Sequence, residues 1–198
     1  MPGKSRIPFT QPEFHVEVAP EELRAAGVAD TDKGTYFHIS PFTTADQREL
    51  PPAQLAELIR KLGEHFPQKK IALSCAATAR ERAKMKELLP LLPQAPWRVF
   101  DGSLNLLQLT GVIQHSALHF GGDTGTLHLA VATQTPAVAW FWPNPGMKMW
   151  LPVSGSCRVV TGVSQPDEAF LTKIAVAELI RLGEELLATV ETRKTTAL

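Results

Sequence analysis

The sequence predicts an α/β protein, with one Rossmann-like parallel sheet and helices on both of its faces. Short apolar runs rich in β-branched and aromatic residues alternate with segments of helical periodicity along residues 35–191. The segments between successive strands are long enough to hold a helical crossover, which parallel neighbours require. With 198 residues, 44% of them hydrophobic and 20% charged, the chain is long enough to bury one sizeable core.

Six segments are expected to be strands because they are short, apolar and bounded by turn-forming residues. The sequence TYFHIS, for example, follows Gly34 and ends before Pro41. The sequence KKIALSC has the apolar character of a strand that is covered on both faces. The predicted strands are residues 35–40, 69–75, 97–100, 117–122, 136–142 and 157–162.

Helices are predicted between these strands from apolar residues that recur at the helical period. Residues 51–66 begin with prolines suited to a first helical turn and continue with an apolar stripe, formed by Leu55, Leu58, Ile59 and Leu62. Thr78 and Glu81 have the spacing of a capping box, and Ser103 is expected to cap the following helix. The predicted helices are residues 51–66, 78–89, 104–115, 126–133 and 167–191.

The domain organisation follows from these elements. Residues 1–34 are rich in proline, charges and turn formers, with one short helical piece near PEELRAAG, and are interpreted as an arm or interdomain linker. Residues 35–191 form the predicted domain, and residues 192–198 form a tail.

Composition gives no support for binding to nucleic acid or to an anionic membrane, because Lys plus Arg and Asp plus Glu number 20 each. Cys75 and Cys157 lie far apart and lack the spacing of metal ligands, which favours free thiols over a disulfide. The first residues lack the apolar core of a signal peptide, and no apolar run approaches the roughly 20 residues of a membrane span. A cytoplasmic protein without a membrane span is expected.

The stretch GGDTGTLH, residues 121–128, carries most of the functional information. It joins a predicted strand to a predicted helix, and ligands of parallel α/β sheets bind beyond the carboxyl ends of the strands. The start of a helix offers unpaired N–H groups and a partial positive charge, which suit a phosphate, and the glycines would let a phosphate approach the backbone. The dinucleotide-binding pattern G-x-G-x-x-G is absent here.

Several motifs, in this order, resemble those of glycosyltransferase family 9, the heptosyltransferase type. The stretch GGDTGTLHLAVATQTPAVAWFWP is similar to the family's D-[ST]-G-x-x-H-L loop and the strand that follows it. Upstream, HISPFTTADQRELPPAQLAELI has the family's strand, hydroxyl-rich loop, basic residue and proline-initiated helix. The run DGSLNLLQLTGVIQHSALHFGG resembles the helix that leads into the loop. The resemblance covers residues 35–185.

This resemblance implies the GT-B fold, in which two Rossmann-like domains face each other across a cleft. The carboxyl-terminal domain binds the nucleotide-sugar donor, and the amino-terminal domain binds the acceptor and supplies the catalytic acid. The chain resembles the carboxyl-terminal half, because a whole enzyme needs about twice this length. The implied activity is sugar transfer, with ADP-heptose as the expected donor and the lipopolysaccharide core or another glycan as the acceptor. No metal or other cofactor is implied, and the expected location is the cytoplasm or the inner face of the membrane.

The resemblance also implies roles for residues at matching positions. No catalytic residue is expected in this chain, because the catalytic acid belongs to the amino-terminal domain. Arg48 would bind diphosphate oxygens, Asp123 a sugar hydroxyl or the loop itself, and His128 would reach back toward the phosphates. The residues expected to bind the donor are Thr43, Thr44, Arg48, Asp123, Thr124, Gly125 and His128, with Gly122, Thr78 and Glu81 as secondary candidates.

Four positions depart from the family pattern. Arg48 stands in place of a lysine, Leu50 in place of a tryptophan, and Trp142 in place of a glycine. Thr78 stands where the family has the acidic residue that contacts the donor ribose, and nearby Glu81 is first interpreted as the capping-box partner. These departures leave an altered donor site as an alternative.

Structural interpretations compete with the functional ones. Asp123 could instead cap the following helix, and His128 could be an ordinary core residue. Thr43 and Thr44 could simply begin a helix, and Arg48 could be a solvated surface charge. His38, His115 and His119 are expected to be structural, since no metal or nucleophile set surrounds them in the sequence. An aromatic and apolar tract is expected in the core or at an interface, formed by Trp140, Trp142, Met147, Met149 and Trp150.

Two further functions stay open for the chain as a whole. One is a non-catalytic nucleotide-binding module that acts with a partner chain, and the other is a different GT-B enzyme such as a sugar-nucleotide epimerase. The donor-site interpretation has a geometric requirement of its own. Strands 35–40 and 117–120 must end at the same edge of the sheet, so that loops 41–48 and 121–126 face one crevice.

Overall fold

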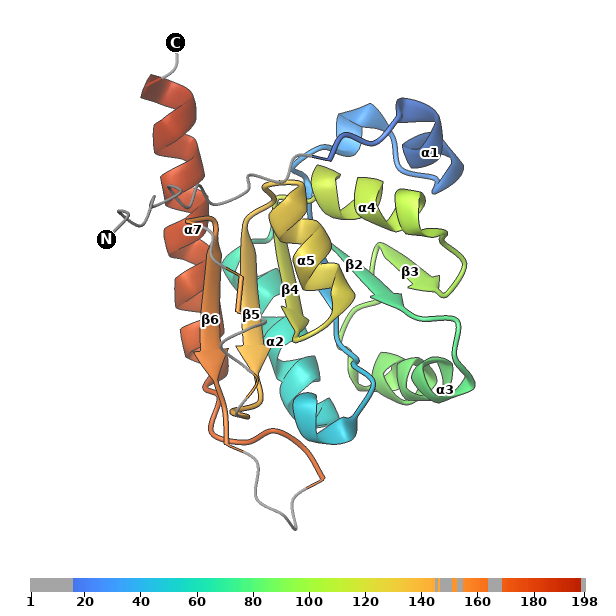
Figure 1. Ribbon diagram of the computed structural model, residues 1–198, viewed down its shortest axis with the longest axis vertical. Coiled ribbons are helices and arrows are strands. Elements are labelled where there is room, and N and C mark those ends of the chain that lie inside the picture. The colour runs from blue at the N-terminus through green and yellow to red at the C-terminus, as the bar shows by residue number, and fades with distance from the viewer. Residues whose placement is uncertain (1–15, 145, 147–150, 153–154, 164–168, 197–198) are drawn as a thin grey trace, which may run out of the picture.

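The computed structural model describes residues 16–144, 146, 151–152, 155–163 and 169–196. Its centre is a six-stranded sheet in the order β3-β2-β1-β4-β5-β6, and every neighbouring pair of strands is parallel (Figure 1). The strands are β1 (Tyr36–Ser40), β2 (Lys70–Cys75), β3 (Arg98–Asp101), β4 (Leu118–Gly122), β5 (Ala137–Phe141) and β6 (Cys157–Thr161). All six predicted strands are present, and each differs from its predicted bounds by a residue or so.

Helices occupy the four crossovers that lead from β1 to β5, as parallel strands require. α2 has proline in its first turn and buries Leu55, Leu58, Ile59 and Leu62, so the predicted apolar stripe faces the core. The helices are α1 (Pro20–Ala25), α2 (Pro52–His65), α3 (Ala79–Leu88), α4 (Leu106–His115), α5 (Gly125–Ala132) and α7 (Val176–Thr196), with short 3-10 turns at Asp30–Asp32, Asp46–Arg48 and Leu89–Leu91.

The two faces of the sheet bury different residues because side chains alternate along each strand. Phe37 and Ile39 of β1 join a core with α2, α3 and α7. Tyr36 packs on the opposite face with residues of α1 and α4, and α4 and α5 cover β5 on that same face. Figure 1 shows α4 and α5 in front of the sheet, α1 beside α4, and α7 along β6. Helices on both faces confirm the predicted Rossmann-like architecture.

The direction of strand addition reverses between β1 and β4. The chain first builds outward from β1 to β3, then returns to the other side of β1 and builds from β4 to β6. β1 and β4 pair from Phe37 with Leu118 to Ser40 with Gly121, so they end at the same edge. This confirms the predicted juxtaposition, and such a reversal leaves a crevice beyond the strand ends where ligands of α/β proteins bind.

Two predicted helix starts were wrong. The closing helix begins at Val176 rather than at residue 167, because Leu171 and Ile174 are buried in non-helical conformation and Thr172 pairs with Val163. Part of the predicted start, residues 164–168, lies outside the described residues. α4 is capped by Asn105 rather than Ser103, because Asn105 and Gln108 form a reciprocal capping box.

The predicted capping box of α3 is half present. The Thr78 hydroxyl accepts the Glu81 N–H at 3.2 Å, as expected for an N-cap. The Glu81 carboxylate does not return to Thr78, because it accepts the N–H of Ala76 at 2.7 Å instead. Glu81 is thereby turned toward the end of β2.

The described part of the predicted arm packs against the domain. Leu23 and Val28 are buried in one cluster with Tyr36 and Val112 of α4. The N–H of Val16 also donates to the carbonyl of Ala132 at the end of α5. Residues 16–34 therefore cover the outer side of α4, and residues 1–15 lie outside the described part of the chain.

Two histidines lie at the middle of the sheet, and both are fully buried. His38 of β1 and His119 of β4 are register partners, their rings stack at 5.0 Å between centroids, and their Nδ1 atoms are 2.9 Å apart. Burial lowers the pKa of His119 to about 3, and burial together with the neighbouring ring puts the pKa of His38 well below its usual value. Both rings are neutral at pH 7, in agreement with a structural role.

Acid is expected to destabilise the fold through this pair. Between pH 6.5 and the low pKa values in the fold, the unfolded chain binds protons that the folded chain excludes, so stability falls as pH falls. The loss by pH 5 should be about 2 kcal/mol for His119, whose pKa in the fold is about 3, and His38 should add to it. Urea unfolding at pH 7.5 and pH 5 measures this difference.

A variant identifies its source. His119→Gln should remove a large part of the pH dependence, because only His38 of the pair then remains buried and neutral. Equal stability of the wild type at both pH values would show that these rings are not buried neutral.

Candidate functional site

A pocket of about 450 Å³ lies at the carboxyl edge of the sheet, next to the reversal point. Ser40 and Ser74 line it from the ends of β1 and β2, and Thr124, Gly125 and Thr126 line it from the start of α5. The loop after β1 contributes Thr43 and Thr44. An apolar wall completes it, formed by Phe42, Phe100, Leu104, Leu106, Leu109 and Leu129.

The structure brings half of the predicted site residues into this pocket. Thr43 and Thr44 meet Thr124 and Gly125 there, although about 80 residues separate the two loops, and Glu81 lies on the same wall. The other predicted residues do not line it: Gly122, Arg48, Asp123, His128 and Thr78. The donor-binding roles of all ten stay predictions.

The start of α5 forms part of the wall of this pocket. Its N-cap is Thr124, in extended conformation, and no side chain caps the helix. The Thr124 hydroxyl instead contacts the hydroxyl of Thr126 at 2.7 Å. Asp123 therefore does not act as the helix cap, and the positive end of the helix dipole of α5 carries no side-chain cap.

The glycines of this loop have different roles. A Cβ atom at Gly121 would lie 2.9 Å from His119 Nε2, and one at Gly122 would lie 2.9 Å from the Thr43 methyl and 3.0 Å from Trp140 Nε1. The sequence suggested that these glycines let a phosphate approach the backbone. In the structure, Gly121 and Gly122 instead make room for the protein's own side chains. Gly125 has nothing within 4 Å of its Cβ position, so it alone leaves open space at the pocket.

A buried carboxylate fixes the loop that carries Thr43 and Thr44. Glu49 is 1% exposed, and its carboxylate accepts the N–H of Thr43 at 2.8 Å. Arg80 and Lys84 of α3 donate to the same carboxylate at 2.9 and 2.5 Å. Arg80 also donates to the carbonyl of Thr43 at 2.6 Å. A buried charge needs such partners, so α3 and the loop hold each other in place.

Asp46 extends this network toward solvent. Its carboxylate bonds to both Arg80 and Lys84, and the hydrogen bond from Lys84 is the main reason that the pKa of Asp46 lies below its usual value. Sequence reasoning missed Glu49, Arg80 and Lys84. Arg80 and Lys84 lie four residues apart, on one face of a helix, but their partners are more than 30 residues away.

Arg48 lies on the other side of the end of β4. Its carbonyl oxygen is 3.4 Å from the Cβ position of Gly122, and its guanidinium lies 5.9 Å from the ring centre of Trp142. Arg48 Nε and Trp140 Nε1 are both buried without a hydrogen-bond partner among the described residues. Trp140 is a core residue, as predicted, whereas Met147, Met149 and Trp150 lie outside the described residues.

The remaining candidates are peripheral or inert. Thr78 and His128 are exposed, and Thr78 is occupied as the cap of α3. Cys75 borders the pocket as a free thiol, and burial raises its pKa to about 11, so it is a poor nucleophile at neutral pH. Cys157 is also a free thiol, as the sequence suggested.

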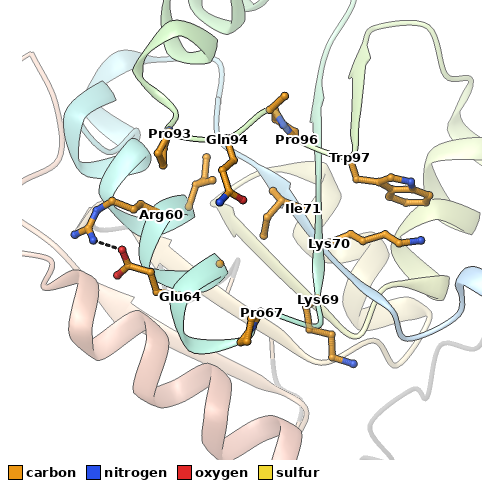
Figure 2. A pocket seen from close by; sticks show the side chains of 13 residues that line it. Arg60, Glu64, Pro67, Lys69, Lys70, Ile71, Pro93, Gln94, Pro96 and Trp97 are labelled. Atoms are coloured by element: carbon orange, nitrogen blue, oxygen red, sulfur yellow. Dashed lines mark hydrogen bonds and ion pairs between the residues drawn. The ribbon is translucent and has the colours of Figure 1, made fainter.

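A second pocket of about 410 Å³ lies at the opposite edge of the sheet, where β2 begins (Figure 2). Its lysines are already engaged, because Lys69 donates to the carbonyl of Gly34 and Lys70 pairs with Asp32. Arg60 and Glu64 bond to each other across its rim at 2.6 Å. Its position at the amino ends of the strands separates it from the site at the reversal point.

Within the described ranges, no group of three or more His, Cys, Asp or Glu side chains is arranged to hold a metal ion. None of the helices in those ranges combines the length and the apolar character needed to cross a membrane.

The roles of the glycines lead to a test. Gly122→Ala should lower the free energy of unfolding by about 1–3 kcal/mol, because the new methyl group must displace Thr43 or Trp140. Gly125→Ala, in open space at a helix start, should leave stability unchanged or raise it by up to about 1 kcal/mol. Urea unfolding of the two variants measures both effects. Equal stability of the two would contradict the packing role of Gly122.

Comparison with known proteins agrees with this fold. The family model of glycosyltransferase family 9 (heptosyltransferase) matches residues 6–173. The structure of E. coli ADP-heptose lps heptosyltransferase II superposes with a TM-score of 0.75 at 20% identity, covering 92% of this chain and 56% of that one. The family 9 glycosyl transferase from Veillonella parvula superposes with a TM-score of 0.71 at 17% identity, covering 88% of this chain and 54% of that one.

A more distant likeness marks the wider fold group. The UDP-GlcNAc 2-epimerase of Methanocaldococcus jannaschii gives a TM-score of 0.54 at 15% identity, covering 84% of this chain and 44% of that one. No match was found among curated protein sequences. The chain spans about half the length of the solved structures it resembles and shares their Rossmann-like α/β fold. The match of the family model over most of the sequence shows that this chain belongs to glycosyltransferase family 9.

Proposed function

We propose that this chain is the donor-binding half of a sugar transferase, and that the pocket at the reversal point binds a nucleoside diphosphate sugar. The observation that carries the proposal is the meeting of two distant hydroxyl-rich loops, at Thr43–Thr44 and Thr124–Thr126, in one pocket beside the start of α5. Both loops belong to motifs that resemble the family's, which supports a shared ligand.

The diphosphate is assigned to the start of α5. Unpaired backbone N–H groups, the helix dipole and the hydroxyls of Thr124 and Thr126 provide donors there. No Lys or Arg is among the described residues that line the pocket, so these neutral donors carry the binding inside it. Arg48, beyond Gly122 at the same edge, is assigned to the phosphate nearer the sugar, where its charge would stabilise the leaving diphosphate.

The nucleoside is assigned to the apolar wall. Phe42, Phe100 and Leu104 offer the flat apolar surface that a base requires. Glu81 lies on the same wall and uses Oε2 to hold the N–H of Ala76, which leaves Oε1 to accept a ribose hydroxyl. Glu81 thus takes the place of the acidic residue that Thr78 replaces in the sequence.

The expected donor is ADP-heptose, and the expected acceptor is the lipopolysaccharide core or another glycan. The donor assignment rests on the family and on the likeness to the E. coli ADP-heptose lps heptosyltransferase II. Binding is expected to need no metal, because the dipole of α5 and the guanidinium of Arg48 would neutralise the diphosphate. The alternative function is that of a UDP-sugar epimerase, like the M. jannaschii neighbour. The two functions differ in the expected nucleotide, which is ADP for the transferase and UDP for the epimerase.

The first test is a calorimetric or NMR titration with ADP in the presence of a chelator. The wild-type chain should bind ADP with a dissociation constant of about 0.1–1 mM, since half a cleft leaves the ligand largely solvated. Gly125→Glu should weaken binding at least about tenfold, because it places a carboxylate beside the phosphate site. Arg48→Ala should weaken it by about 10- to 100-fold through the lost charge-assisted bonds.

The matched control is Gly63→Glu. Gly63 also has open space at its Cβ position but lines the second pocket, so ADP binding should not change. Equal weakening by both glutamates would indicate a non-specific charge effect. Binding that requires magnesium, or UDP binding tighter than ADP binding, would contradict the ADP-sugar proposal.

A second test concerns turnover. The isolated chain should bind the donor without transferring its sugar, because the catalytic acid of the family is expected in the amino-terminal domain. ADP release from ADP-heptose in the presence of a lipopolysaccharide-core acceptor measures this. Release by the purified chain above that of the Arg48→Ala variant would show that the catalytic group lies in this chain.

A further inference from the structure

A row of three polar side chains crosses the sheet beneath the pocket. Ser74 of β2, His38 of β1 and His119 of β4 lie on the face covered by α4 and α5, and they are 3%, 0% and 0% exposed. The Ser74 hydroxyl is 2.9 Å from His38 Nε2, and His38 Nδ1 is 2.9 Å from His119 Nδ1. Ser74 also lines the pocket, so the row begins at its wall and ends in the core.

The contact between the two rings restricts their protons. Both rings are neutral, so each carries one N–H, and a 2.9 Å contact between two Nδ1 atoms requires one donor and one acceptor. Two arrangements satisfy this. In one, His38 donates from Nδ1 and accepts the Ser74 proton at Nε2. In the other, His119 donates from Nδ1 and His38 donates from Nε2 to the Ser74 oxygen.

The far end of the row decides between them. His119 Nε2 is buried and has no hydrogen-bond partner in the described part of the chain. The first arrangement leaves a buried N–H there without an acceptor, and the second leaves only a lone pair, which proteins tolerate better. The Cβ position of Gly121 is 2.9 Å from this nitrogen, so the glycine's Cα–H lies beside it, and a lone pair suits that neighbour better than an N–H.

We propose that Ser74 is a binding residue of the pocket, and that His38 and His119 are positioning residues that turn its hydroxyl proton outward to an acceptor oxygen of the bound ligand. With its oxygen accepting from His38, the Ser74 hydroxyl has its own proton free to donate. The proposal rests on the proposed function for the identity of the ligand, a nucleoside diphosphate. Such a fixed donor is valuable in a pocket without Lys or Arg among its described lining, since the hydroxyl loses little freedom when the ligand binds.

The proton arrangement can be tested without any ligand. Nitrogen-15 NMR of the free chain at pH 7 distinguishes protonated from bare ring nitrogens. We expect His38 to carry its proton on Nε2 and His119 on Nδ1, and Ser74→Ala to shift the His38 Nε2 resonance. The neighbouring Ser40→Ala, which also removes a hydroxyl from the pocket wall, should leave it in place. Protons on His38 Nδ1 and His119 Nε2 would overturn the proposal.

The second measurement is the titration of these variants with ADP. Ser74→Ala should bind ADP about 5- to 10-fold more weakly than the wild type. Ser40→Ala should lose less affinity for ADP, because no histidine orients the Ser40 hydroxyl that it removes. Unchanged affinity in a folded Ser74→Ala chain, or an equal loss in Ser40→Ala, would refute the role of Ser74 while leaving the donor site intact. Absence of ADP binding in the wild type would instead refute the proposed function and, with it, the ligand role of Ser74.

Discussion

The parallel pairing of β1 with β4 is the constraint on which the rest of the structure depends. It joins two halves of the sheet that grow in opposite directions, and it brings Ser40 and Gly121 side by side at one edge. Loops that follow these residues must therefore share a crevice. The histidine pair at the middle of the same two strands adds a buried hydrogen bond to this junction. Site and core thus rest on the same contact.

The loop after β1 illustrates how a segment that lines the pocket is held still. Thr43 and Thr44 lie outside regular secondary structure, yet Glu49 binds the backbone of Thr43, and α3 binds Glu49 through Arg80 and Lys84. The carbonyl of Glu49 in turn accepts the N–H of Leu171. A buried carboxylate that lost these partners would be strongly unfavourable, so the network resists partial opening. The loop is consequently preorganised before any ligand arrives.

The pocket departs from a phosphate site built on lysine or arginine. Its polar wall consists of hydroxyls, a helix start and one carboxylate, and Arg48 lies outside it beyond Gly122. Neutral donors bind a diphosphate well only where their orientation is fixed, since a free hydroxyl must give up rotation on binding. The contacts between Thr124 and Thr126 and between Ser74 and His38 supply such orientation.

The sequence by itself determined the order of strands and helices, the sheet edge that carries the site, and the family. These features follow from the local periodicity of each segment and from the two motifs at residues 38–59 and 121–143. Both kinds of signal can be read from a segment on its own. Tertiary structure decided the rest. Arg48 and Asp123 do not line the pocket, whereas Ser74 and the secondary candidate Glu81 do, and Gly121 and Gly122 are packing positions. The partners of Glu49 on α3, and the partners of His38 and Gly122, lie 30 or more residues away along the chain or on other strands. Such contacts depend on how the elements pack in space, and the pattern within any one segment does not contain that information.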